Sequence, residues 1–242
     1  MDLEPYKSFA REKLGFEFRD INLLVAALTH RSFVNESHNP DAVHNERLEF
    51  LGDAVLELVS SDFLYRNYNE PEGIMTSWRA ALVRTEANCA AGKELGYDHL
   101  IRLSKGEKRG TERAHDVIIA DCYEAIIGAV YLDQGYPTAK KLIEKHNLSK
   151  IDSILAEGSW RDAKSRFQEL AQHFDGATPT YRTIREDGPD HDKVFTIGVY
   201  VGEISRGIGT GHSKQEAEQN AARQGIAYYK NLEKLETPTE NA

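Results

Sequence analysis

The feature that most constrains this chain is a stretch, residues 117–132, that is apolar on nearly every side when placed on a helix. Such a helix must be buried on most of its faces. Its only charged residues are Asp121 and Glu124, which share one side of the helix and have no Lys or Arg within a turn. Because a buried, unpaired carboxylate is costly, each should be protonated, paired or bound to a metal, and the pattern favours a metal. We expect Asp116 to be the N-cap.

A second acidic helix is predicted from Glu46 to about Tyr68. Glu46, Glu49 and Asp53 share a narrow arc beside its apolar face. In an arbitrary protein such an arc is most often a solvated edge, because like charges one turn apart repel one another. Here the two helices could cross with four carboxylates converging at the crossing, and Gly52 and Gly128 would let their backbones approach closely.

A converging set of carboxylates suits a hard divalent cation. Mg²⁺ takes oxygen ligands, usually a few carboxylates together with waters and substrate phosphates. Two such ions about 4 Å apart activate a water and stabilise the leaving oxygen in phosphodiester hydrolysis. A structural Ca²⁺ site is the alternative, but its usual loop spacing is absent from this part of the sequence.

Composition limits the class of protein. The chain has 242 residues, which is enough for two domains. Its formal net charge of −9 argues against a protein that binds nucleic acid mainly through an overall excess of positive charge. The acidic excess lies in residues 1–157, whereas residues 158–231 are balanced. Cys89 and Cys122 lack metal-type spacing and are interpreted as reduced thiols of a cytoplasmic protein. We expect no signal segment, membrane span or organic cofactor.

The remaining pattern divides the chain in two. Residues 1–35 are predicted to be helical, with Asp20 as a possible cap, and further helices are expected over 75–94 and 134–150 around a polar loop at 104–114. After a hinge at 157–159 the pattern becomes one helix at 163–174, strands at 180–185, 193–201 and 204–210, and a last helix from Ser213 to about Asn231. This order predicts a compact α+β domain.

Two long motifs carry a family resemblance. Residues 44–56, HNERLEFLGDAVL, resemble the signature of the ribonuclease III endonucleases, and residues 119–128, IADCYEAIIG, resemble their second catalytic helix. Residues 164–230 are similar to the family's double-stranded-RNA-binding domain, with GPDH at 188–191 and GTGHSK at 209–214. The resemblance covers nearly the whole chain in the expected order.

The resemblance implies an all-α endonuclease domain over 1–150, a linker over 151–160, an α-β-β-β-α domain that binds double-stranded RNA over 161–231, and a disordered tail over 232–242. The implied enzyme is a homodimer through its N-terminal domain that uses Mg²⁺, with Mn²⁺ as a plausible substitute. It would cut both RNA strands to leave 5′-phosphate and 3′-hydroxyl ends, processing ribosomal RNA precursors and other structured transcripts in the cytoplasm.

The site residues implied by the resemblance fall into three sets. The metal-binding catalytic set is Glu49, Asp53, Asp121 and Glu124. Glu46 and Glu72 would support the same acidic valley. Positions matching the family's RNA contacts are Ser165, Gln168, Glu169, His191, Ser213 and Lys214. Such contacts suit a domain that reads 2′-hydroxyls and phosphates of A-form RNA across its minor grooves, aided by the N-terminus of the last helix.

The sequence departs from the family at a few positions. Ile74 stands where relatives often have an acidic or polar residue, and Gln215 and Glu218 stand where many carry basic ones, which suggests modest RNA affinity. Two other functions compete with the nuclease: a regulator that binds double-stranded RNA without cutting, and a metal-dependent phosphohydrolase of small substrates. A regulator is expected to lack one or more metal carboxylates, and a small-molecule enzyme has no use for the C-terminal domain.

Overall fold

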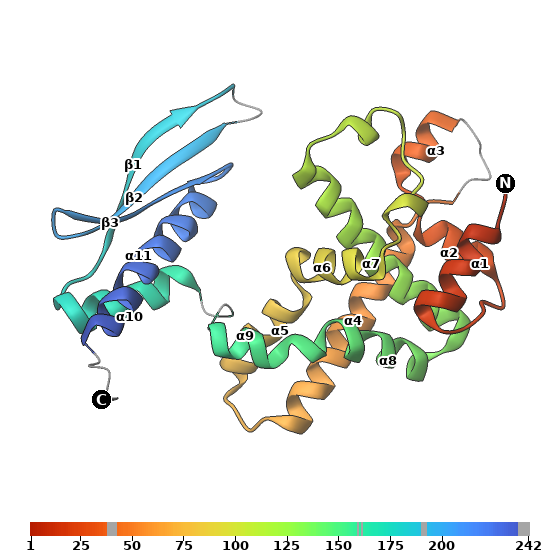
Figure 1. The fold of residues 1–242 in the computed structure, drawn as a ribbon, viewed down its shortest axis with the longest axis horizontal. Coiled ribbons are helices and arrows are strands. Elements are labelled where there is room, and N and C mark those ends of the chain that lie inside the picture. Colours follow the sequence, from red (N-terminus) through yellow and green to blue (C-terminus); the bar gives the residue numbers. More distant parts are fainter. Residues whose placement is uncertain (38–42, 159, 161, 190–192, 237–242) are drawn as a thin grey trace, which may run out of the picture. The chain divides into compact units, whose positions relative to one another are not determined.

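The structure is a computed structural model that describes residues 1–37, 43–158, 160, 162–189 and 193–236. The chain forms two compact units, residues 1–160 and residues 161–242 (Figure 1). No helix within the described ranges is long and apolar enough to cross a membrane.

The first unit is built from helices around one hydrophobic core. Its described helices are α1 (Glu4–Phe9), which continues as a π-helical turn (Ala10–Leu14), α2 (Ile21–Ala27), α3 (Arg31–Ser37), α4 (Glu46–Asn67), α5 (Glu72–Val83), α6 (Thr85–Leu95), α7 (Glu112–Gln134), α8 (Tyr136–His146) and α9 (Ile151–Glu157). Short 3₁₀ turns lie at Asp98–Leu100, Glu107–Arg109 and Leu148–Lys150. The all-α architecture predicted for this part of the chain is confirmed.

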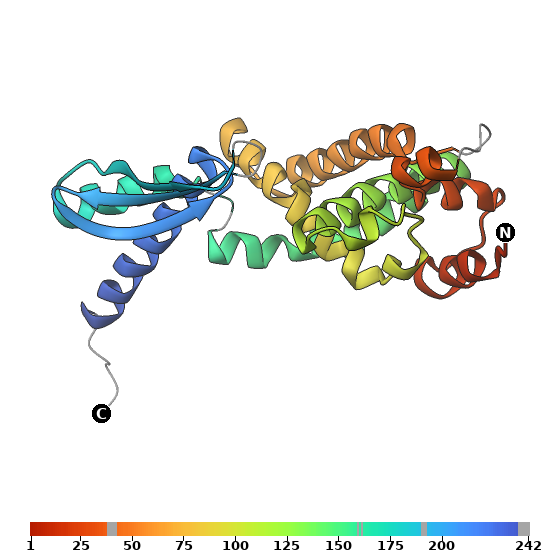
Figure 2. The same ribbon diagram turned by 90° about the horizontal axis from the view of Figure 1, so that it is seen from above.

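Helix α7 is the centre of this unit, and α4 packs along it (Figures 1 and 2). From Ile118 to Val130 every apolar side chain of α7 is buried, as its sequence requires. The closest approach of the two helices is at their glycines. A Cβ on Gly52 would lie 1.8 Å from the backbone oxygen of Glu124, and a Cβ on Gly128 would lie 2.2 Å from that of Leu48. The prediction that these glycines permit close contact is confirmed.

Two helix boundaries differ from the sequence prediction. The helix expected over 75–94 is two helices, because the backbone turns extended at Arg84 and ends α5 there. The carbonyl of Val83, which has no helical partner at this break, accepts a hydrogen bond from the Asn88 side chain at 2.9 Å. Helix α7 begins one turn earlier than expected, because Thr111 is its N-cap, and Asp116 instead pairs with Lys93 at 2.5 Å.

The segments predicted to be linker and tail contain helix. Residues 151–157 form α9, whose first residue, Ile151, is buried in the core of the first unit. Helix α11 (Lys214–Glu236) likewise extends through the first five residues of the expected tail. Residues 237–242 lie outside the described part of the chain.

The second unit has the predicted α-β-β-β-α order. Helix α10 (Ala163–Asp175) is followed by strands β1 (Thr180–Asp187), β2 (Val194–Val201) and β3 (Ile204–Gly211), and then by α11. The sheet is antiparallel in the order β1-β2-β3, with α10 and α11 packed against it (Figure 1). Its core contains Phe167, Val199, Val201 and Tyr229. The predicted capping box is present in part, since the amide of Glu216 donates to Ser213 Oγ at 3.1 Å.

The glycine contact gives a direct test of the fold. Gly52→Ala should lower the free energy of unfolding by about 3 kcal/mol, because a methyl group at this position overlaps backbone atoms of α7 that cannot move aside. Gly73→Ala is the matched control: it also lies in a helix, and nothing would contact its Cβ within 4 Å. Its stability should be unchanged or higher by up to about 1 kcal/mol. Equal effects in denaturant unfolding would contradict the proposed tight crossing.

Candidate active site and RNA-contact surface

The four candidate catalytic carboxylates lie where α4 crosses α7. Glu49 and Asp53 flank Gly52 on α4, and Asp121 and Glu124 lie on the facing part of α7. Because the backbone of Gly52 contacts that of Glu124, the side chains beside this contact are held near one another. Glu49, Asp121 and Glu124 are partly buried, whereas Asp53 is exposed to solvent. The structure therefore forms an acidic site with one open side.

Burial and mutual repulsion make this site electrostatically unfavourable without a cation. The pKa of Glu49 is raised to about 7 by burial and then by the charges of Asp121, Glu46 and Asp53. The pKa of Glu124 is raised to about 7 by burial and by Asp53, with further contributions from Glu49 and Asp121. Burial also raises the pKa of Asp121. Each of the four carboxylates thus contributes to, or responds to, a shared negative field.

Among the described residues, no Lys or Arg forms an ion pair with Glu49, Asp53, Asp121 or Glu124. Glu124 has a neutral partner in the described part of the chain, because Asn88 Nδ2 donates to its Oε1 at 2.8 Å. Within the residues that the structure describes, no three or more Asp, Glu, His or Cys side chains are already arranged so that they could hold a metal ion together. An oxygen-only, uncompensated donor set of this kind fits Mg²⁺, which completes its shell with waters and substrate oxygens.

The two supporting acids lie in different places. Glu46 begins α4, is exposed, and lies 3.4 Å from Arg31, while its charge reaches Glu49. Glu72 begins α5 and lines a cavity beside Leu64 near the other end of α4. From Asp53 to Leu64 the rise of the helix is about 16 Å. Within one copy of the chain, Glu72 is therefore not part of the acidic site.

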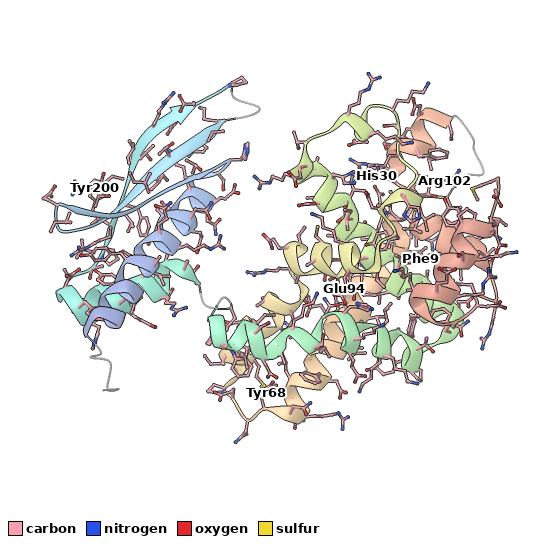
Figure 3. The ribbon with its side chains drawn as sticks, in the orientation of Figure 1. Phe9, His30, Tyr68, Glu94, Arg102 and Tyr200 are labelled. Atoms are coloured by element: carbon pink, nitrogen blue, oxygen red, sulfur yellow. The ribbon has the colours of Figure 1, made fainter. Side chains whose placement is uncertain are left out.

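His30, labelled beside Arg102 in Figure 3, lies close enough to this site for its ring and the Asp121 carboxylate to shift one another's pKa. Its backbone N–H donates to the carbonyl of Arg102 at 3.1 Å, and its Nδ1 lies 2.8 Å from Ser32 Oγ. Burial lowers the pKa of His30, while Glu107, Asp121 and Glu46 oppose that shift. These contacts fix the ring beside the site, consistent with a structural residue that the acidic field also reaches.

The candidate RNA contacts that the structure describes in the second unit are all exposed. Ser165, Gln168 and Glu169 are exposed on α10. Ser165 and Gln168 line a cavity of about 330 Å³ together with Gln215 and Gln219 of α11, so the first turns of the two helices adjoin. Ser213 and Lys214, at the start of α11, are also exposed. His191 lies outside the described residues.

Both lysines at this surface are engaged by carboxylates. Lys214 Nζ lies 3.0 Å from Glu186 Oε1 of β1, and Lys164 Nζ lies 2.6 Å from Glu218 Oε2 of α11. Glu218, one of the departures noted in the sequence, therefore neutralises a neighbour. Ile74, another departure, packs against the core of the first unit. The two lysine–glutamate pairs therefore leave this candidate RNA surface with little net positive charge, although it carries basic residues.

Asn88 is a site residue that sequence analysis missed. It is fully buried on α6 and contacts a candidate catalytic carboxylate from a helix that neither acidic motif includes. The only local signal was a polar residue on an apolar helix face, which does not distinguish a core hydrogen bond from an active-site contact. The break between α5 and α6, which the sequence did not indicate, places its side chain.

Comparisons with known proteins agree with this arrangement. Residues 20–151 match a family model described as ribonuclease-III-like, and residues 163–229 match the double-stranded RNA binding motif. The chain is 42% identical over 226 residues to ribonuclease 3 of Pelotomaculum thermopropionicum, covering 93% of this chain and 94% of the relative. It is 43% identical over 217 residues to ribonuclease 3 of Enterococcus faecalis, covering 89% and 94%.

A solved structure is similar to the first unit. The nuclease domain of ribonuclease III from Campylobacter jejuni, described as having structural flexibility in a region involved in dimer formation, superposes with a TM-score of 0.51 at 38% identity. The match covers 57% of this chain and 96% of that domain.

The ion pair at Lys214 leads to a prediction about RNA affinity. Glu186→Gln should tighten duplex RNA binding by about twofold to fivefold, because an exposed pair of this kind contributes up to about 1 kcal/mol and competes with phosphate. The slope of log affinity against log salt should steepen by up to about one. Glu203→Gln is the control, since it removes the same charge from Arg182 rather than from a lysine at this surface. Equal behaviour of both variants in a salt titration would contradict the contact at Lys214.

Proposed function

This chain belongs to the ribonuclease III family and is an endoribonuclease with a double-stranded-RNA-binding domain, and we propose that it hydrolyses phosphodiester bonds of double-stranded RNA with Mg²⁺. The products carry 5′-phosphate and 3′-hydroxyl ends. The observation that carries this proposal is the set of four carboxylates at the α4–α7 crossing. Three of them are partly buried, and no Lys or Arg among the described residues forms an ion pair with the set. Such a site has negative charge that a divalent ion and its substrate phosphate can use.

Glu49, Asp53, Asp121 and Glu124 are the residues that would hold the metal. Bound Mg²⁺, or Mn²⁺ in its place, supplies an activated water and stabilisation of the leaving 3′-oxygen. The exposed side of the site, at Asp53, is where a duplex backbone can enter. The buried side, at Glu124, is held by Asn88 and keeps that carboxylate in one orientation. The protein's own contribution is thus to fix anionic oxygens around the phosphodiester.

The second unit is proposed to bind the duplex by shape. Ser165, Gln168 and Glu169 can exchange hydrogen bonds with 2′-hydroxyls, which an RNA duplex presents in its wide minor groove. The free N–H groups at the start of α11, with Ser213 and Lys214, favour a phosphate. His191 is assigned to a second groove contact from the resemblance alone. Since Lys164 and Lys214 are already paired, binding by this domain should be modest.

A homodimer through the first unit is supported by an exposed apolar stripe on α4. Phe50, Leu58 and Tyr65 are 80%, 58% and 78% exposed, and their spacing places them on one side of the helix. Beside Tyr65 lies a cavity of about 280 Å³ lined by Leu64, Glu72, Met75 and Arg79. Two antiparallel copies of α4 related by a two-fold axis near Leu58 would place Phe50 of one copy at this cavity of the other.

The same pairing gives Glu72 its role. Glu72 lines the cavity that would receive Phe50, and Phe50 adjoins Glu49 in the acidic site. In the dimer, Glu72 from one copy would therefore lie beside the carboxylates of the other, as a supporting acid. Two sites related by a two-fold axis match the two strands of a duplex, so one dimer can cut both.

The biological role follows from the family. Processing of ribosomal RNA precursors and other structured transcripts in the cytoplasm is proposed on that ground. A regulator that binds duplex RNA without cutting is the second candidate, but it has no need for four retained carboxylates. A phosphohydrolase of small substrates leaves the second unit unexplained.

The central test is cleavage of a long, perfectly paired RNA duplex. Wild-type protein should shorten it in Mg²⁺ but only bind it in Ca²⁺, and end labelling should detect 5′-phosphates. Glu124→Gln should lower cleavage by at least about a thousandfold, since it removes a metal ligand, while gel-shift affinity for the duplex stays within twofold. Retained turnover in this variant would overturn the site assignment, and binding without cutting by the wild type would favour the regulator.

The exposed stripe predicts dimer loss in Phe50→Ser. Removing this ring from the interface should shift sedimentation at micromolar concentration from dimer to monomer and lower duplex cleavage at least about tenfold. Ile204→Ser serves as the control, since Ile204 is a 60% exposed apolar residue in the second unit. A Phe50→Ser protein that sediments and cleaves like the Ile204→Ser protein would rule out this interface.

A further inference from the structure

A buried chain of hydrogen bonds ends on Glu124. The Tyr123 hydroxyl donates to Asn147 Oδ1, and Asn147 Nδ2 donates to Asn88 Oδ1 at 3.1 Å. Asn88 Nδ2 in turn donates to Glu124 Oε1 at 2.8 Å. The first three residues are 0%, 2% and 0% exposed, so the chain lies inside the core. It starts on α7, passes through the residue after α8 and through α6, and returns to α7 one residue from its start.

The direction of every bond in this chain is determined. Both amide hydrogens of Asn88 are used, one on Glu124 and one on the carbonyl of Val83. Both of Asn147 are used as well, on Asn88 and on the carbonyl of Leu82. Turning either amide over would set its oxygen against other acceptors. The only donor at the far end is the Tyr123 hydroxyl, so the chain can end only on an acceptor oxygen.

The same bonds tie the site to the break between two helices. Leu82 and Val83 end α5, and their carbonyls are without helical partners because the backbone turns extended at Arg84. Asn88 and Asn147 satisfy these carbonyls and Glu124 together. A purely apolar core would leave both carbonyls unpaired, so the two asparagines have a structural task as well as contact with the acidic site.

We propose that Asn88, Asn147 and Tyr123 are positioning residues that set the orientation of Glu124 for divalent-metal binding. Asn88 donates to Oε1 of Glu124 and so restrains the rotation of this carboxylate. The carboxylate is thereby held in one rotamer before the metal arrives, and no ordering is required on binding. Mutation of a residue that hydrogen-bonds to a metal ligand typically lowers metal affinity or activity by about 10-fold to 100-fold. This inference rests on the proposed function, because it takes Glu124 as a ligand.

The test measures Mn²⁺ binding to the RNA-free, full-length protein by titration calorimetry, together with kcat and KM for duplex cleavage. Asn88→Leu keeps the side-chain volume but removes the bond to Glu124, and should raise the Mn²⁺ Kd about 10-fold to 100-fold. In Mg²⁺, kcat should fall while KM for the duplex stays constant. Tyr123→Phe removes only the far donor and should raise the Mn²⁺ Kd about twofold to tenfold.

Tyr97→Phe is the matched control. Tyr97 is also fully buried against α7, and its hydroxyl donates to the carbonyl of Ile119 at 2.6 Å, outside the chain that reaches Glu124. It should lose similar stability but keep wild-type Mn²⁺ affinity. If Tyr123→Phe and Tyr97→Phe bind Mn²⁺ equally, or if folded Asn88→Leu stays within twofold of wild type, the positioning role is overturned.

Glu124→Gln separates this result from the proposed function. If Glu124→Gln loses Mn²⁺ binding and cleavage while the Asn88 and Tyr123 variants match wild type, only the positioning role fails. If Glu124→Gln itself binds Mn²⁺ and cleaves like wild type, the metal site fails with it. The tyrosine pair keeps the test valid even if Asn88→Leu does not fold.

Discussion

The backbone contact between Gly52 of α4 and Glu124 of α7 is the constraint on which this structure depends. No side chain fits between the two helices there, so the residues beside the glycines are held at a fixed separation. They include four carboxylates, and packing against the apolar body of α7 removes Glu49, Asp121 and Glu124 partly from water. Tight packing and charge repulsion therefore act on the same few residues. The fold stabilises the crossing through its apolar core, and the crossing keeps the anionic site assembled.

The surrounding core contains polar groups that serve this arrangement. Asn88 and Asn147 satisfy the carbonyls at the break after α5 and hold one oxygen of Glu124. The second unit has a different electrostatic character, with its surface lysines paired by Glu186 and Glu218. In the proposed function the two units have different tasks. The acidic unit would need a divalent ion before a phosphate could approach, and the charge-balanced unit would hold the duplex mainly by shape.

Much of this could be predicted from sequence because the signals were local. The apolar pattern around Asp121 and Glu124 indicated a buried helix, and Gly52 and Gly128 indicated a close crossing. The break at Arg84 could not be predicted, since no proline or glycine marks it and one of its two free carbonyls is satisfied by Asn147, a residue distant in sequence, while Asn88 satisfies the other. The position of Glu72 beside Leu64, away from the α4–α7 crossing, depends on how α5 packs against α4, which a local pattern does not give, and its supporting role stays a prediction. The helix break and the position of Glu72 depend on contacts between segments that are distant in sequence, which local patterns do not contain.

The most direct measurement is the free energy of unfolding against pH, with and without Mg²⁺, for wild type and Glu49→Gln/Glu124→Gln. The folded-state pKa of Glu49 and of Glu124 is about 7, above the ordinary 4.5, so the folded protein holds more protons between these values. Metal-free wild type should therefore lose stability relative to the double variant as pH rises from about 4.5 to 7, by on the order of 1 kcal/mol after allowing for screening by water.

Saturating Mg²⁺ at pH 8 should restore that stability in the wild type alone, because the ion binds only the folded carboxylates. Parallel pH curves for the two proteins, or equal stabilisation of both by Mg²⁺, would contradict the account of an uncompensated carboxylate site at the α4–α7 crossing.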